Sequence, residues 1–217
     1  EFSGQWYQKL AANQEILASA WRSIWIALVT TGIATVLGTA ASLAMFRYEF
    51  RGKKVLQALL FPPIAIPWLI TGTAMLIFFF SVGIGRGSPA VILGHVALAL
   101  PYVIVVVSAR LKTFDPVLEE AARSVGASRA RTTRDVTVPL TRYGLLGAWL
   151  LIFLIFEREY STGVYLLSPG TETIGSMLVS LWAGGAIDIV AALSFVNIVL
   201  VAVGLGIALR FGVKLHD

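Results

Sequence analysis

The sequence predicts an all-α protein that crosses a membrane several times, and two observations support this fold class. Hydrophobic residues make up 57% of the 217 residues and charged residues only 13%, whereas a soluble domain usually carries about 25% charged residues. Several apolar runs also reach roughly 20 residues, which is the length that a helix needs to cross the hydrocarbon core of a bilayer. We therefore expect a polytopic membrane protein.

Five membrane spans are predicted, together with a short helix around 173–183 in the loop before the last span. The spans cover 22–46, 55–82, 90–109, 143–166 and 189–209. In the first span, Gly32 and Gly38 allow close packing of neighbouring helices. In the second span, Pro63 and Pro67 are expected to break or kink the helix, because proline lacks the backbone N–H donor.

The basic residues predict an orientation, because cytoplasmic loops carry an excess of Lys and Arg. Most of the 17 Lys and Arg residues lie in the loop after the first span, between 110 and 142, or after the last span. Residues 115–139 and the C-terminus are therefore expected in the cytoplasm, and residues 1–20 outside it. Because residues 1–20 lack the features of a secretory signal, we expect a sixth, N-terminal span, either removed or part of a longer fused chain.

Residues 115–139 are the most polar stretch of the chain, and they are predicted to form two short helices joined by a sharp bend. Asp115 followed by Pro116 is a favourable helix start. Gly126 suits a left-handed cap at the end of the first helix. Pro139 is expected to end the second helix before the fourth span.

The first of these helices is amphipathic. Ala121 and Ala122 belong to its apolar face, whereas Glu120 and Arg123 lie on the opposite face as an i, i+3 pair. One interpretation is a helix that rests on the membrane surface. The other is a rigid helical knob that meets a partner protein, and the glycine at the bend favours the knob.

A family resemblance is carried by this segment. The pattern Glu120-Ala121-Ala122, three residues, Gly126, nine residues, then VTVP ending at Pro139 resembles the EAA motif of the permease subunits of bacterial ATP-binding-cassette (ABC) type I importers, the binding-protein-dependent transport family. The usual ending is Ile-x-Leu-Pro, and both departures exchange one aliphatic residue for another. Nearly the whole chain shares the resemblance: GHVALALPYVIVVVSARL is similar to polyamine permeases, and REYSTGVYLLSPGTETIGSMLVSLWAGG to ferric-iron permeases.

The resemblance implies that 116–139 is a coupling helix seated in a groove of a nucleotide-binding subunit. The residues implied in coupling to the ATPase are Glu120, Ala121, Ala122, Arg123, Gly126, Val136 and Pro139. The sequence contains no G-x-x-x-x-G-K-[ST] phosphate-binding loop, so this chain is not expected to be an enzyme or to bind a cofactor. ATP and Mg would be bound by the partner subunit.

The implied partners are ABC ATPase subunits, an extracytoplasmic solute-binding protein, a second permease copy or half, and the lipid of the bacterial inner membrane. No nucleic-acid partner is expected, because the positions of the basic residues are explained by the side of the membrane that each loop faces. The cargo would be ferric iron or a small cationic solute such as a polyamine, with thiamine and an organophosphonate also open. The main alternative function is an ATP-independent channel or secondary transporter, in which 116–139 only rests on lipid.

The fourth predicted span contains Glu157, Arg158 and Glu159, and ionisable groups inside a membrane are functional candidates. Acidic groups suit a cationic solute, and Arg158 can neutralise either neighbour. The alternative is a solvated cluster at the outer interface. The residues proposed to line the translocation pathway are Glu157, Glu159, Tyr160, Pro63 and Pro67.

No catalytic or metal site is predicted. The chain has no cysteine, which excludes thiolate chemistry, and no serine lies in a recognisable pairing with a base. His95 lies near the outer end of the third span, and we expect it to be hydrogen-bonded to a neighbouring helix. An intramembrane enzyme is therefore disfavoured, and a purely structural adaptor does not explain prolines and charges within spans.

Overall fold

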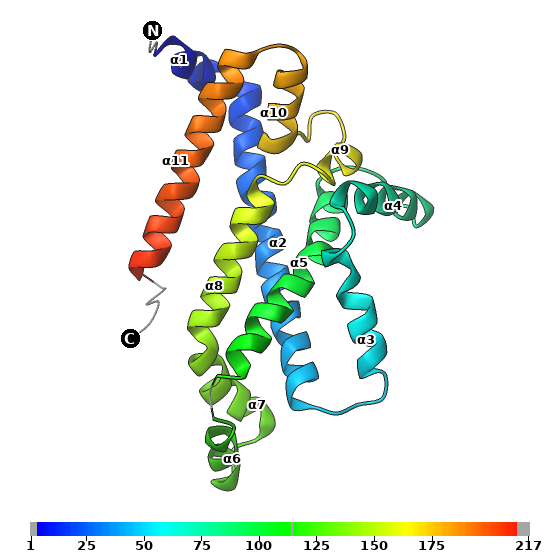
Figure 1. The fold of residues 1–217 in the computed structure, drawn as a ribbon, viewed down its shortest axis with the longest axis vertical. Coiled ribbons are helices and arrows are strands. Elements are labelled where there is room, and N and C mark those ends of the chain that lie inside the picture. The colour runs from blue at the N-terminus through cyan, green and yellow to red at the C-terminus, as the bar shows by residue number, and fades with distance from the viewer. Residues whose placement is uncertain (1–3, 114, 212–217) are drawn as a thin grey trace.

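The structure is a computed structural model that describes residues 4–113 and 115–211, and every regular element in these residues is helical (Figure 1). The predicted all-α fold is confirmed. The α-helices are α1 (Gln5–Ala12), α2 (Gln14–Arg47), α3 (Lys53–Leu60), α4 (Trp68–Ser81), α5 (Ser88–Leu111), α6 (Val117–Ser124), α7 (Arg129–Thr132), α8 (Val138–Glu157), α9 (Gly163–Leu166), α10 (Ile174–Ala183) and α11 (Ile187–Phe211). A 3₁₀ turn, η1 (Pro62–Ile64), and a π-helical stretch, η2 (Thr133–Thr137), complete the set.

The core of the molecule lies where α2, α5 and α8 pack along one another (Figure 1). Ala34 of α2, Val103 of α5 and Ile152 of α8 are completely buried members of this core. Four helices of the described residues are long and apolar enough to cross a membrane, and the bent pair formed by α3 and α4 can supply a fifth span. Because three long apolar helices share one core, their relative positions are fixed by side-chain packing.

The close approach of α2 and α5 depends on Gly38. A Cβ atom placed on Gly38 would lie 2.6 Å from Cγ1 of Val103, whereas a Cβ atom on Gly32 would meet nothing within 4 Å. The predicted use of Gly38 for close helix packing is confirmed. Helix interfaces in membranes are enriched in small residues because these allow backbones to approach.

We expect Gly38→Ala to destabilise the protein by about 1–3 kcal/mol, the usual cost of overpacking a core. The matched control is Gly32→Ala, which adds the same methyl group to the same helix at an open position. Thermal unfolding of the purified protein in detergent should show a lower midpoint for Gly38→Ala only. Equal midpoints for the two variants would contradict the packing assignment.

The predicted second span, 55–82, is not one continuous helix. The α3–η1 segment and α4 meet at an angle of 118°, and the break contains Pro63 in η1 and Pro67 immediately before α4. The expected proline break is therefore confirmed, and α4 turns sharply to the side of α3 (Figure 1). The reason is that proline cannot donate the backbone hydrogen bond that would continue α3 into α4.

The predicted fourth span, 143–166, is wrong at its C-terminal end. The helix α8 begins at Val138 and ends at Glu157, and after a turn at 158–162 the short helix α9 follows. The loop beyond it contains α10, which confirms the short helix expected around 173–183. These segments gather with α1 and the start of α11 at one end of the bundle, opposite α6 and α7 (Figure 1).

Candidate functional site

The bend between α6 and α7 is formed by a glycine cap. Asp115 Oδ1 accepts a hydrogen bond from the Val117 N–H at 2.9 Å, which caps the start of α6. Gly126 has a φ angle of +91°, and the Ala127 N–H donates to the Ala122 carbonyl at 3.1 Å. A six-to-one bond of this kind with a left-handed glycine is the Schellman arrangement. The predicted left-handed cap at Gly126 is confirmed.

Pro139 does not end the second helix, which corrects the prediction. Residues from Arg129 to Glu157 run on as one helical segment, and Pro139 lies at the second position of α8. The π-helical stretch η2 precedes it, with the Val138 N–H donating to the Thr133 carbonyl. Rearranged hydrogen bonding of this kind accommodates the missing N–H donor of a proline inside a helix.

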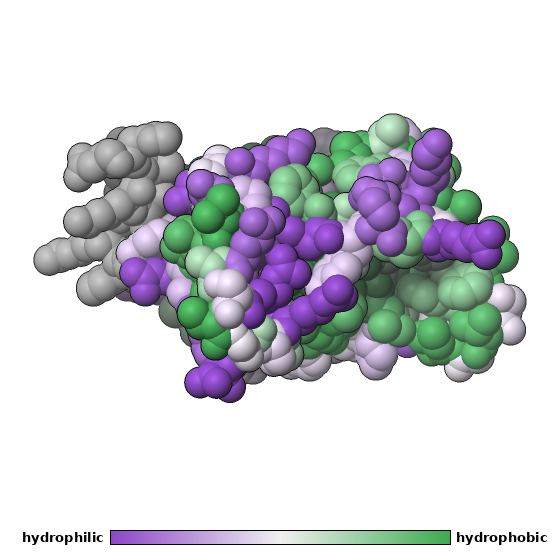
Figure 2. Space-filling view, turned by 90° about the horizontal axis from the view of Figure 1, so that it is seen from below, coloured by the Kyte–Doolittle hydropathy of each residue, from purple (hydrophilic) through white to green (hydrophobic). Residues whose placement is uncertain are grey.

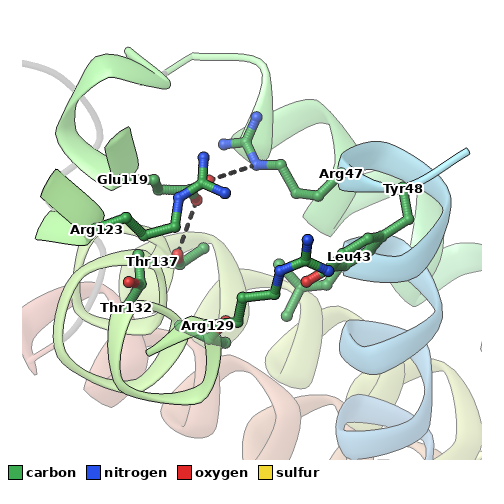
Figure 3. Close-up of a pocket in the computed structure, with 9 residues that line it drawn as sticks. Leu43, Arg47, Tyr48, Glu119, Arg123, Arg129, Thr132 and Thr137 are labelled. Carbon is green, nitrogen blue, oxygen red and sulfur yellow. Dashed lines mark hydrogen bonds and ion pairs between the residues drawn. The ribbon is translucent and has the colours of Figure 1, made fainter. Parts of the chain in front are cut away.

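Glu119 joins three elements at this end of the molecule. Its Oε2 lies 3.0 Å from Nε of Arg47, the last residue of α2, and its Oε1 accepts a hydrogen bond from Oγ1 of Thr137 at 2.8 Å. The two charged side chains are only 17% and 14% exposed. Figure 3 shows the carboxylate held between these two partners. Glu119 therefore ties α6 both to the end of α2 and to the segment that leads into α8.

Glu120 has a different environment. Its side chain is exposed, and within the described residues it has no hydrogen-bond or ion-pair partner, so the predicted pair with Arg123 is not formed. Glu120 therefore does not brace the bend through Arg123, and the neighbouring Glu119 makes the contacts to other elements instead. The helical pattern gave no signal for Glu119, because its partners Arg47 and Thr137 lie on other elements.

The apolar face of α6 is left open. Val117, Leu118 and Val125 are 58%, 47% and 85% exposed, and no residue of α6 is buried. Figure 2 shows hydrophilic side chains gathered over this end of the molecule, with hydrophobic groups among them. The other residues that the resemblance implies in coupling to the ATPase differ in exposure. The exposed ones are Ala121, Arg123, Gly126 and Pro139, and the half-buried ones are Ala122 and Val136.

At the opposite end of the bundle, Glu159 is the centre of a buried polar cluster. Its Oε2 accepts hydrogen bonds from His95 Nε2 at 2.8 Å and from Thr162 Oγ1 at 2.6 Å, and its Oε1 accepts from the Thr162 N–H at 2.9 Å. The side chains of His95 and Glu159 are 1% and 2% exposed. His95 is hydrogen-bonded as expected, but its partners Glu159 and Thr162 lie in the turn between α8 and α9 and not in a neighbouring helix.

Glu157 is also buried, at 6% exposure. Its Oε1 accepts a hydrogen bond from Asn197 Nδ2 of α11 at 3.4 Å, while its Oε2 has no hydrogen-bond partner in the described part of the chain. Both carboxylates are only 6% exposed, so the alternative of a solvated cluster is wrong. Glu157 is the last residue of α8, and Glu159 lies in the turn that follows it. Arg158 is exposed and forms no ion pair with Glu157 or Glu159 in the described residues, so it neutralises neither by direct contact.

A cavity of about 370 Å³ lies beside Glu157, between α2, α8 and α11. Trp149 and Phe153, two turns and one turn before Glu157 on α8, line it, and their rings are stacked with centroids 5.4 Å apart. Two aromatic side chains and Glu157, one of whose oxygens has no hydrogen-bond partner in the described residues, thus line the same cavity. Such a combination attracts organic cations through charge and cation–π interactions.

The other pathway candidates lie in separate places at the same end of the molecule. Pro67 is followed by Trp68, whose ring stacks on Phe156 with centroids 5.4 Å apart, so the α3–α4 break is packed against the end of α8. Tyr160 is 40% exposed, and Pro63 is half-buried in η1. Through Phe156, which also contacts the His95 ring at 4.9 Å, the break and the carboxylates belong to one packed region.

We expect Glu159→Ala to destabilise the protein by about 1–3 kcal/mol for each donor left unsatisfied, because a buried hydrogen-bond donor without an acceptor costs free energy. His95 and both donors of Thr162 would lose their acceptor. The midpoint of thermal unfolding in detergent measures the effect. Tyr160→Phe, at the exposed adjacent position, is the control, and equal midpoints for the two variants would contradict the buried cluster.

Comparisons with known proteins identify the family. Residues 34–216 match the model of the family described as "Binding-protein-dependent transport system inner membrane component". The spermidine/putrescine transport system permease protein PotC of Haemophilus influenzae is 33% identical over 199 residues, which are 92% of this chain and 77% of that protein. The putrescine transport system permease protein PotI of Escherichia coli K12 is 28% identical, over 82% of this chain and 66% of that protein.

Solved structures share the fold. A bacterial ABC transporter that imports the acidic polysaccharide alginate aligns with a TM-score of 0.82 and 16% identity, covering 100% of this chain and 85% of its own. The inward-facing methionine ABC transporter MetNI aligns with a TM-score of 0.75 and 18% identity, covering 89% of this chain and 93% of its own. Together with the family match and the apolar helices, these likenesses show that the chain belongs to the inner membrane components of binding-protein-dependent transport systems, as a multi-pass permease subunit of an ABC importer.

Proposed function

We propose that this permease forms half of the translocation pathway of an ATP-driven importer and that α6 receives the movement of a partner ATPase. The observation that carries the proposal is the double contact of Glu119 with Arg47 at the end of α2 and with Thr137 just before α8. Both α2 and α8 belong to the core bundle. A displacement of α6 would therefore move two spanning helices together, because packed interfaces shift between discrete arrangements.

The ATPase would dock on the open face of α6. Val125, beside the bend, is 85% exposed, and Ala121 on the same helix allows a partner to approach closely. In this proposal ATP and Mg belong to the partner, and the permease binds no cofactor. The exposed Glu120 carboxylate would then contact the ATPase directly, since it makes no contact that braces α6.

The proposed orientation places α6, α7 and the C-terminus in the cytoplasm, and α9 and α10 on the outer side. The distribution of basic residues supports this orientation. A solute-binding protein would deliver cargo at the α10 end, and a second permease copy or half would complete the pathway. The positions of Glu157 and Glu159 support a pathway opening at that end, where both carboxylates lie buried beside α11 and α5.

The proposed cargo is a polyamine or a similar small organic cation. The free oxygen of Glu157 and the stacked rings of Trp149 and Phe153 suit an alkylammonium group. Two relatives carry names of polyamine permeases, which favours a polyamine over ferric iron, the other cation that the sequence analysis left open.

Uptake by the reconstituted transporter tests this proposal directly. The permease is purified with its ATPase and solute-binding protein, and uptake of labelled spermidine, putrescine and ferric iron into proteoliposomes is measured with and without ATP. We expect ATP-dependent uptake of a polyamine. Uptake that continues without ATP would instead indicate a channel or secondary transporter, and uptake of ferric iron alone would overturn the proposed cargo.

We expect Gly126→Pro to abolish ATP-driven uptake while leaving the spans folded. Proline fixes φ near −65°, whereas Gly126 has a φ of +91° and its N–H donates to the Arg123 carbonyl at 3.0 Å. Uptake, ATPase activity and helical content by circular dichroism are measured together. Gly170→Pro is the matched control, since it changes a glycine of similar φ, +81°, in the distant loop after α9. Normal uptake by Gly126→Pro would refute a role of the bend in coupling.

A further inference from the structure

A cavity of about 170 Å³ lies between the end of α2 and the α6–α7–η2 segment. Arg47, Arg123 and Arg129 line it, and they come from α2, α6 and α7 respectively. Figure 3 shows the three guanidinium groups reaching into the same space. We call this cavity the arginine pocket. Arginines that converge from three separate elements are positioned by the tertiary fold and not by the periodicity of one helix.

The positive charge of the arginine pocket is only partly compensated. Glu119 is the one carboxylate among its lining residues, and both oxygens of Glu119 already have partners in Arg47 and Thr137. Arg129 lies over the Tyr48 ring at 5.4 Å, a contact that leaves its charge in place, and Arg123 has no ion-pair partner in the described residues. Because like charges around one concavity repel, this arrangement favours an anion at its centre.

The geometry points to a phosphate group as that anion. A guanidinium presents a planar fork of N–H donors that matches two oxygens of a phosphate, and such paired contacts are stronger than neutral hydrogen bonds. We propose that the arginine pocket binds a phosphate group through Arg123 and Arg129, with Arg47 holding Glu119 aside. The proposal does not depend on the cargo or on the ATPase.

Two sources can supply the phosphate, free inorganic phosphate and the headgroup of an anionic phospholipid. The arginine pocket lies where α2, a candidate spanning helix, ends at Arg47. Basic pockets at the ends of spanning helices bind anionic headgroups. An occupant would also bridge α6 and α7 across the pocket, so bound phosphate should make the α6–α7 segment more resistant to local opening.

The test uses the complete transporter without ATP, in nanodiscs of phosphatidylcholine. In one arm phosphatidylglycerol is mixed into the nanodisc lipid, and the lipid that stays bound after extraction, with and without added inorganic phosphate, is counted by native mass spectrometry. In the other arm inorganic phosphate is titrated into nanodiscs of phosphatidylcholine alone, and hydrogen exchange of residues 117–132 is followed. We expect the double variant Arg123→Gln, Arg129→Gln to weaken binding about tenfold or more, as loss of two charge-assisted contacts requires.

The matched control is the double variant Arg131→Gln, Arg134→Gln. It removes the same number of charges from the same segment, but its side chains are 70% and 78% exposed and lie outside the arginine pocket. Binding in the control should equal that of the parent protein. Because Arg123 and Arg129 are exposed, their variants are expected to fold, and the single variant Arg123→Gln provides a milder test of the same contact.

The outcomes distinguish a lipid headgroup, free phosphate and unspecific surface charge. Retention of phosphatidylglycerol that free phosphate does not displace supports a lipid headgroup, whereas protection by phosphate alone, or displacement of the lipid by phosphate, supports a site open to the free ion. Equal weakening in both double variants would overturn the proposal in favour of unspecific surface charge. Absence of binding in both arms for the parent protein would overturn it as well.

Discussion

Replacement of Glu119 by glutamine is expected to uncouple ATP hydrolysis from solute uptake. The variant loses the 3.0 Å ion pair with Arg47, whose guanidinium is half-buried and keeps its charge. An interaction with a charged group contributes about 1.5–3 kcal/mol, which corresponds to roughly a 10- to 150-fold change in an equilibrium. In proteoliposomes the amount of polyamine taken up per ATP hydrolysed should fall accordingly, while the rate of hydrolysis falls much less.

Two comparisons isolate the contact. The exchange variant Arg47→Glu, Glu119→Arg restores opposite charges and should recover part of the coupling, as a double-mutant cycle requires. Glu49→Gln is the matched control, because the Glu49–Lys53 pair is solvent-exposed on its acidic side, at 89%, and exposed pairs contribute only about 0–1 kcal/mol. Coupling that is normal in Glu119→Gln would show that α6 moves α2 by another route.

The local features of the fold could be predicted because short-range signals determine them. Apolar runs of spanning length located the long helices, Pro63 and Pro67 located the α3–α4 break, and Gly126 located the bend. Glycine and proline set the backbone conformations that are allowed at their own positions, and a long apolar run favours the membrane over water. These effects act whatever residues lie nearby. The end of α8 was missed because apolar residues return at Val164 after the charged and polar residues at 157–163, and hydropathy alone does not show where a helix turns.

The contacts of the candidate sites could not be predicted, because they join residues far apart in the sequence. His95 and Glu159 are 64 residues apart, and Glu119 finds Arg47 only once α6 folds back beside α2. The helical pattern places Glu119 and Glu120 on the same polar side, so it cannot distinguish the glutamate that braces α6 from the glutamate that stays exposed. Tertiary packing makes that distinction.

Glu157→Gln is expected to lower the uptake of a cationic solute while ATPase activity stimulated by the binding protein is retained. Glutamine has the same shape and can keep the hydrogen bond from Asn197, so the variant removes charge and little else. A hydrogen bond to a charged group contributes about 1.5–3 kcal/mol, or roughly a 10- to 150-fold change in affinity. Uptake of spermidine or putrescine at subsaturating concentration measures the loss.

The choice of controls follows from burial. Glu15→Gln removes a carboxylate from the exposed start of α2 and should leave uptake unchanged, since solvent screens an exposed charge. Phe153→Leu keeps an apolar wall beside Glu157 but removes one of the two stacked rings. It should reduce uptake by a smaller factor than Glu157→Gln, because a cation–π contact is weaker than a charge-assisted hydrogen bond. If Glu157→Gln transports normally while Phe153→Leu does not, the cavity contributes packing only, and the cation crosses the membrane along a path that avoids this carboxylate.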